Sequence, residues 1–154
     1  MQQTRRSVIK AGGAAALVAA FGATLLMPGR AQAAWNKGAF EAKSIFDAMR
    51  ALGMANAEDT KAVEIRAPDI AENGAVVPIA IESRLPGTES ITLLIERNPQ
   101  PLAASFSIPA GTEPNVSTRV KIGESSDVYA LVKAEGKFYL AKKEVKITIG
   151  GCGG

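Results

Sequence analysis

The side chain best suited to covalent chemistry is Cys152, the only cysteine among 154 residues. It has no second cysteine for a disulfide and no bulky neighbours that would pack around a structural thiol. Two glycines stand on either side of it, so the predicted segment is Gly150, Gly151, Cys152, Gly153 and Gly154. Because glycine lacks a Cβ, this composition predicts a flexible, thin arm that carries the thiol about 10 Å beyond Ile149, into a narrow cleft of another protein.

The arm offers a thiol but no group that would activate it. An unperturbed thiol has a pKa of about 8.5, and no Lys, Arg or His adjoins Cys152 to lower that pKa. The chain contains no histidine at all, which excludes a Cys-His nucleophile, a His-ligated metal and a c-type haem motif. We therefore expect no catalytic residue, metal or cofactor on this chain, and a thiol that the proteins binding it activate.

The element that must position this thiol is the strand predicted for residues 137–149. Val145, Ile147 and Ile149 alternate with polar residues, so one face is buried up to the residue before Gly150. We expect order to stop abruptly there, at the junction of a rigid strand and a mobile arm.

The rest of the domain reads as short β-runs after one helix. Residues 36–52 predict a helix because Ala42, Ile45, Phe46, Met49 and Leu52 form one apolar stripe, and Gly53 suits its C-cap. Further strands are predicted at residues 62–67, 75–83, 91–96, 103–108, 115–122 and 127–134. The fold class is therefore all-β, an antiparallel immunoglobulin-like β-sandwich with an N-terminal helix, over residues 34–149.

Pro78 interrupts the strand at residues 75–83. Proline cannot donate to a β-ladder, so this strand is predicted to lie at a sheet edge or to be bulged. An edge with apolar neighbours either stays protected or adds a partner strand, and the residues alone favour neither.

Residues 1–33 predict an export signal rather than part of the fold. Arg5 and Arg6 lie in Thr-Arg-Arg-Ser-Val-Ile-Lys, a twin-arginine pattern, and an Ala/Gly-rich apolar stretch and an Ala-Gln-Ala cleavage site follow. The apolar stretch is short for a membrane span, so we expect cleavage after Ala33, release into the periplasm and no stable membrane insertion.

Charge argues against nucleic acid as a partner. The net charge is +3, but four of the 18 basic residues and none of the 15 acidic residues fall in residues 1–33. The remaining chain has 14 basic and 15 acidic residues, a net charge of −1, and carries no basic block.

The run Val-Lys-Ile-Thr-Ile-Gly-Gly-Cys-Gly-Gly at residues 145–154 resembles the C-terminal signature of the SoxY family. SoxY proteins are the sulfur-carrier subunits of the bacterial Sox thiosulfate-oxidising system, and the Gly-Gly-Cys-Gly-Gly terminus matches the family motif at all five positions. The resemblance implies a periplasmic carrier that holds thiosulfate-derived sulfur covalently on Cys152, and not an enzyme.

The same resemblance implies the partners. A SoxZ-like subunit would form a heterodimer with this chain, which favours the partner reading of the Pro78 strand. A c-type cytochrome would couple thiosulfate to Cys152, a hydrolase would release sulfate, and a sulfane dehydrogenase would oxidise the sulfur left behind.

Three other functions stay open from the residues. Cys152 could be an intermolecular disulfide tether in a structural or interaction protein. Gly153 and Gly154 suggest a thiocarboxylate carrier, but its activation needs ATP, which the periplasm lacks. An independent enzyme would need a histidine or an acid pair near the thiol, and the sequence offers neither.

Overall fold

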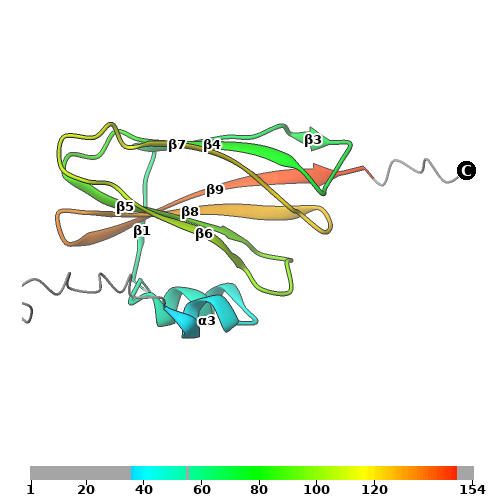
Figure 1. The fold of residues 1–154 in the computed structure, drawn as a ribbon, viewed down its shortest axis with the longest axis horizontal. Coiled ribbons are helices and arrows are strands. Elements are labelled where there is room, and N and C mark those ends of the chain that lie inside the picture. Colours follow the sequence, from blue (N-terminus) through cyan, green and yellow to red (C-terminus); the bar gives the residue numbers. More distant parts are fainter. Residues whose placement is uncertain (1–35, 55, 149–154) are drawn as a thin grey trace, which may run out of the picture. The chain divides into compact units, whose positions relative to one another are not determined.

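The computed structural model describes residues 36–54 and 56–148. Within these residues two short helices come first and nine strands follow (Figure 1). Their bounds are α2 Lys37–Glu41, α3 Ile45–Ala51, β1 Glu58–Asp59, β2 Val63–Arg66, β3 Ile70–Ala71, β4 Val77–Ser83, β5 Thr88–Ile95, β6 Leu102–Ser107, β7 Asn115–Val120, β8 Ser126–Ala134 and β9 Lys137–Ile147. The predicted all-β class with N-terminal helical residues is confirmed.

Two sheets form the sandwich. The larger has the order β1-β9-β8-β5-β6, with β3 also paired to β9, and the smaller has the order β2-β4-β7. The long strands pair antiparallel as predicted, whereas β1 and β3, which the sequence analysis missed, pair parallel to β9. Each of these two strands has only two residues, too few for a hydrophobic period to appear in the sequence.

The larger sheet is covered on both faces. One core, which includes Ile79, Leu93 and Val132, fills the space between the two sheets. A second core, which includes Ala48, Leu94 and Leu131, joins the helices to the other face of the larger sheet. In Figure 1, β4 and β7 lie on one side of β5, β8 and β9, and α3 lies on the other. Because both faces are covered, the last five residues of β5 are all buried instead of alternating.

The single helix predicted over residues 36–52 is wrong, because the chain breaks between α2 and α3. Ala42 is extended, with ψ of 142°, and its small side chain is buried. Ser44 then starts a new helix as its N-cap, since its Oγ accepts a hydrogen bond from the Asp47 amide at 3.1 Å. The break turns Phe46 out of the predicted apolar stripe, and its side chain is 57% exposed.

Gly53 ends α3 as predicted, although the cap residue itself is Leu52 and Gly53 is the residue that follows it. Gly53 has a φ of +72°, which glycine adopts without steric cost. Its amide donates to the Arg50 carbonyl at 3.0 Å, and the Met54 amide donates to the Met49 carbonyl at 2.8 Å. These two bonds form a Schellman motif that ends α3 and directs the chain toward the sheets.

The edge position predicted for Pro78 is also wrong, because β4 is the central strand of the smaller sheet. β2 pairs with β4 only between Ala80 and Ser83, whereas β7 pairs along β4 as far as Val77. Pro78 therefore lies beyond the end of β2 and is exposed. The missing N–H is tolerated there because β2 supplies no partner for it.

Candidate functional site

Every residue for which the sequence predicts a chemical or targeting role lies outside the described residues. This holds for Cys152, for its four flanking glycines and for Arg5 and Arg6. The last described residue before Cys152 is Thr148, four positions earlier. The structure therefore shows how the chain is held immediately before the predicted arm.

The end of β9 is held by hydrogen bonds from both sides. On the side of β3, the Lys146 amide donates to the Asp69 carbonyl at 2.9 Å, and the Thr148 amide donates to the Ala71 carbonyl at 3.2 Å. On the other side, the Ile147 amide donates to the Ser125 Oγ at 2.9 Å. Backbone hydrogen bonding therefore continues through Thr148, one residue past the end of β9, and the strand predicted for residues 137–149 is confirmed as far as Ile147.

Gly74 brings the loop between β3 and β4 into close contact with the end of β9. The Ile122 amide donates to the Gly74 carbonyl at 2.7 Å. A Cβ on residue 74 would lie 2.4 Å from the Ile122 carbonyl oxygen and 3.1 Å from Cγ2 of Ile147. Only glycine fits here, and the sequence analysis missed this role although the Asn73-Gly74 pair is a turn signal.

A second loop contact stabilises the same end of the sandwich. Asn98, between β5 and β6, donates from Nδ2 to the Lys121 carbonyl at 2.8 Å. Its Oδ1 accepts from the Gly123 amide at 3.1 Å. We call residues 69–76, 121–125 and 147–148 the arm base. They comprise the end of β9 with Thr148 and the two loops that contact it.

The arm base carries two exposed apolar side chains. Among the described residues, the large hydrophobic side chains that are exposed are Ile70 at 58%, Val76 at 52% and Phe46 at 57%. Ile70 and Val76 belong to the arm base, on either side of the Asn73-Gly74 turn. Phe46 belongs to α3, where the Arg50 guanidinium lies 4.6 Å from its ring centroid.

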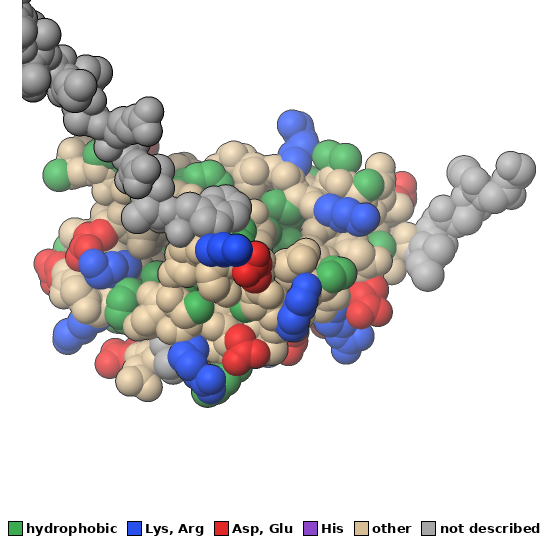
Figure 2. All heavy atoms as spheres, turned by 60° about the horizontal axis from the view of Figure 1, so that its bottom comes forward, with side chains coloured by type: hydrophobic (Ala, Val, Ile, Leu, Met, Phe, Trp, Pro, Cys, Tyr) green, Lys and Arg blue, Asp and Glu red, His purple; other side chains and the backbone are tan. Residues whose placement is uncertain are grey.

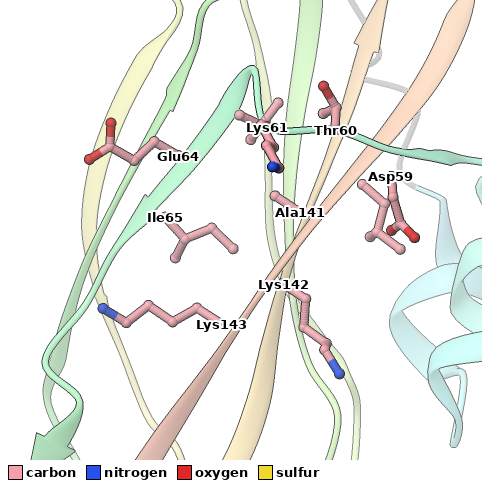
Figure 3. Close-up of a pocket in the computed structure, with 10 residues that line it drawn as sticks. Asp59, Thr60, Lys61, Glu64, Ile65, Ala141, Lys142 and Lys143 are labelled. Atoms are coloured by element: carbon pink, nitrogen blue, oxygen red, sulfur yellow. The ribbon is translucent and has the colours of Figure 1, made fainter.

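A separate cavity of about 570 Å³ lies between β2 and β9 (Figure 3). Its lining contains no cysteine, histidine or serine. Figure 3 shows Lys143 reaching from β9 toward β2, while Lys142 points the other way. Lys143 forms an ion pair with Asp69, with 3.0 Å between Nζ and Oδ1. The Glu64 carboxylate forms ion pairs with Arg66 at 2.8 Å and with Arg84 at 2.7 Å.

Three charged groups of this lining, those of Glu64, Lys142 and Lys143, are engaged in ion pairs with their neighbours. A hydrogen bond from Lys142 to Asp127 raises the pKa of the Lys142 ammonium, which keeps this amine protonated and removes it as a nucleophile. The cavity therefore offers no feature that singles it out as the functional site.

The described part of the chain contains no helix long and apolar enough to cross a membrane. In residues 36–54 and 56–148, no group of three His, Cys, Asp or Glu side chains is placed to hold a metal ion. Figure 2 shows basic and acidic side chains interspersed over the described part of one face.

Comparison with known proteins connects this fold to one family. The family model described as sulfur oxidation protein SoxY matches residues 48–152. The solved structure of the sulfur carrier protein SoxY from Chlorobium limicola f thiosulfatophilum is 36% identical to this chain, with a TM-score of 0.63, and the match covers 70% of this chain and 95% of that chain. The search of the curated proteins found no match.

A second solved chain, from a study of T-cell activation by the bacterial superantigen toxic shock syndrome toxin-1, has 10% identity and a TM-score of 0.40, covering 56% of this chain and 99% of that chain. A likeness this weak carries no argument.

The SoxY family match, by contrast, spans all nine described strands and runs to Cys152. The chain therefore belongs to the SoxY family of proteins that act in sulfur oxidation.

Proposed function

We propose that this chain is a periplasmic sulfur carrier that holds thiosulfate-derived intermediates covalently on Cys152 and presents them to partner enzymes. The observation that carries the proposal is the extent of the family match, which runs to residue 152, the only cysteine of the chain. The solved relative is described as a sulfur carrier protein, which supports the same role here.

The chemistry of loading requires a partner that accepts electrons. The Cys152 thiol and thiosulfate join through a new S–S bond, which releases the thiol proton and two electrons to a c-type cytochrome. Water then attacks the terminal sulfonate, so that sulfate leaves and a persulfide stays on Cys152. A sulfane dehydrogenase oxidises that outer sulfur with water as the oxygen source and takes six electrons, which regenerates a sulfonate for the next hydrolysis.

This division of labour fits the residues of the chain. The sequence has no histidine, so no imidazole is present to deprotonate the thiol or to ligate a redox metal. Disulfide-type S–S bonds form and exchange readily, which suits a residue that must be loaded and unloaded. The chain therefore has no turnover by itself.

Export and assembly belong to the same proposal. Arg5 and Arg6 direct the folded chain through the twin-arginine pathway, residues 1–33 are removed, and a SoxZ-like subunit completes a heterodimer. The domain comprises residues 34–149, and residues 150–154 form the carrier arm. The anchored end of β9 supports this arrangement, because a fixed attachment keeps the thiol at a high effective concentration near a docked enzyme.

The proposal is tested by the intact mass of the chain isolated from the periplasm of cells grown with and without thiosulfate. We expect sulfur adducts only in the presence of thiosulfate, and none in Cys152→Ser. Purified protein mixed with thiosulfate alone should stay unmodified, since no electron acceptor is present. Rapid loading without a partner, or adducts that persist in Cys152→Ser, would contradict the carrier function.

A further inference from the structure

The length of chain between the described body and Cys152 limits where a partner can dock. Cys152 is four residue steps beyond Thr148, and even a fully extended chain spans no more than about 14 Å over four steps. A partner that brings the thiol into an enclosed reaction site must therefore place its own surface within that distance of Thr148. The described residues nearest to Thr148 are those of the arm base, since Ala71 accepts its amide hydrogen bond.

The arm base differs from the rest of the described surface in its apolar exposure. It carries Ile70 and Val76, two of the three large exposed hydrophobic side chains of the described residues. A shallow hollow of about 270 Å³ also lies in the arm base, lined in part by Gly74, Ile122 and Ile147. A protein surface laid over this area would remove apolar side chains from water, which is the main source of affinity in most protein interfaces.

The charges at and beside the arm base nearly balance. Glu72 and Glu124 are exposed acids, and Lys121 and the adjoining Lys146 are exposed bases. Asp69, the remaining acid of the arm base, is paired with Lys143 at 3.0 Å. The surface therefore has little net field to attract a strongly acidic or strongly basic partner. The chemistry of the surface therefore fits an apolar rim on the partner, with association that depends weakly on salt.

The backbone of this surface is fixed. The Ile122 amide donates to the Gly74 carbonyl at 2.7 Å, and the Ala75 amide donates to Asn73 Oδ1 at 2.9 Å. Together with the bonds of Ser125 and Asn98, these contacts hold both loops against β9. A preorganised surface of this kind loses little conformational entropy when a partner binds.

We propose that Ile70 and Val76 form a docking surface that the proteins acting on Cys152 share, each with an apolar rim around its reaction site. Because the short connection brings every such partner to the same surface, only one can be bound at a time. This inference rests on the proposed carrier function, and it adds the place and the exclusivity of docking.

The test uses Ile70→Glu and Val76→Glu in the full mature chain with its co-purified second subunit. Phe46→Glu is the matched control, because Phe46 has the same exposure but belongs to α3. Each purified variant is added, together with thiosulfate, to periplasmic extract from a strain that lacks this chain. Adduct formation is then followed by the intact mass of the variant. Alkylation of Cys152 by iodoacetamide measures the intrinsic accessibility of the thiol.

We expect the rate of adduct formation to fall at least about tenfold in Ile70→Glu and Val76→Glu, the effect of losing one well-buried interface contact. Alkylation rates, melting temperatures and recovery of the second subunit should stay as in the wild type, and Phe46→Glu should load normally. Ile70→Leu should load normally too, since it preserves the apolar surface. Excess Cys152→Ser protein, whose arm base is unchanged, should compete for the partners and inhibit loading of the wild type. The double variant Cys152→Ser with Ile70→Glu should inhibit less.

Two results would overturn the docking surface. Normal loading of Ile70→Glu and Val76→Glu would show that partners do not use these side chains. Loss of the second subunit from these variants would assign the surface to the stable assembly. Neither result touches the carrier function, which fails instead if Cys152→Ser still supports thiosulfate oxidation.

Discussion

At the scale of single residues, the proposed carrier function rests on one thiol and on its neighbours in sequence. Cys152 has no histidine, lysine or arginine beside it, so the proposal assigns its activation to the partner that binds it. The structure adds Gly74, whose missing side chain allows one loop to approach both Ile122 and Ile147. Chemistry and attachment are thus carried by different residues, and they can be tested separately.

Cys152→Ser should abolish support of thiosulfate oxidation, because an alcohol forms no S–S bond. The free energy of unfolding should change by no more than about 0.5 kcal/mol, since the flanking glycines offer no side chains for the thiol to pack against. Complementation of a deletion strain and urea denaturation measure the two effects. A large loss of stability would show that Cys152 is a packed structural residue.

Gly74→Ala should destabilise the fold by about 1 to 3 kcal/mol, the usual cost of forcing a methyl group into a filled space. The added Cβ would lie 2.4 Å from a backbone oxygen that has little freedom to move. Gly123→Ala is the control at the same end of the sandwich, because its Cβ would have its nearest neighbour at 3.8 Å. Urea midpoints for both variants, at unchanged m-value, measure the difference.

At the scale of elements, β9 is the strand that connects the fold to the carrier residue. It pairs with β8 along nine residues and with β1 and β3 at two separate points on its other edge. In the smaller sheet, β2 and β4 are joined by an ion-pair cluster of Glu64, Arg66, Glu82 and Arg84. These pairs are solvent-exposed, so their contribution to stability is modest and is reduced by salt.

This cluster should make part of the stability depend on acid pH. The hydrogen bond and charge of Arg66 lower the pKa of Glu64 below its ordinary value of 4.5. A carboxylate with a lowered folded pKa stabilises the fold above its unfolded pKa, and that stabilisation is lost as the pH falls through the folded value. Melting temperature should therefore decline below about pH 4.5, and Glu64→Gln should decline less.

Glu113→Gln controls for the loss of one negative charge, because Glu113 lies in the loop before β7 and outside the cluster. Thermal melts of the three proteins at neutral and acid pH, in low and high salt, give the comparison. An equally steep decline in Glu64→Gln and wild type would show that the β2-β4 cluster does not contribute.

At the scale of the whole molecule, the described body has three layers: the helices, the larger sheet and the smaller sheet. The arm base lies beside the core between the two sheets, since Ala71 and Ile122 belong to both. The proposed carrier function predicts that residues 150–154 serve partners without contributing to either core.

An exposed thiol on a carrier also has a cost. Air oxidation should join two copies through Cys152, with loss of two protons and two electrons to dioxygen, and these dimers should not accept thiosulfate. A thiol reductant should restore monomers of this chain and loading together, as measured by non-reducing gels and intact mass. If the reduced form were inactive and the disulfide dimer the working species, Cys152 would be a tether and not a carrier.

Part of this structure could be predicted because local patterns determine it. Alternating runs such as the one in β4 and the glycine after α3 are local signals, and both were found. The break before Ser44 was missed although the cap from Ser44 to Asp47 is local, because the apolar stripe appeared continuous and the burial of the extended Ala42 depends on packing against the larger sheet. Pro78 was placed on an edge because a sequence does not show how far the neighbouring strand extends.

The sequence by itself determined the prediction that Cys152, the single thiol between four glycines, is the reactive group, because no other residue of the chain suggests comparable chemistry. The family match through residue 152 supports that choice. Tertiary structure alone decided how the chain is held before the arm. Asp69, Gly74 and Ser125 all lie beside the end of β9, although they precede it by 22 to 77 residues in the sequence. Contacts over such separations arise from sheet pairing and loop packing, which no local pattern encodes.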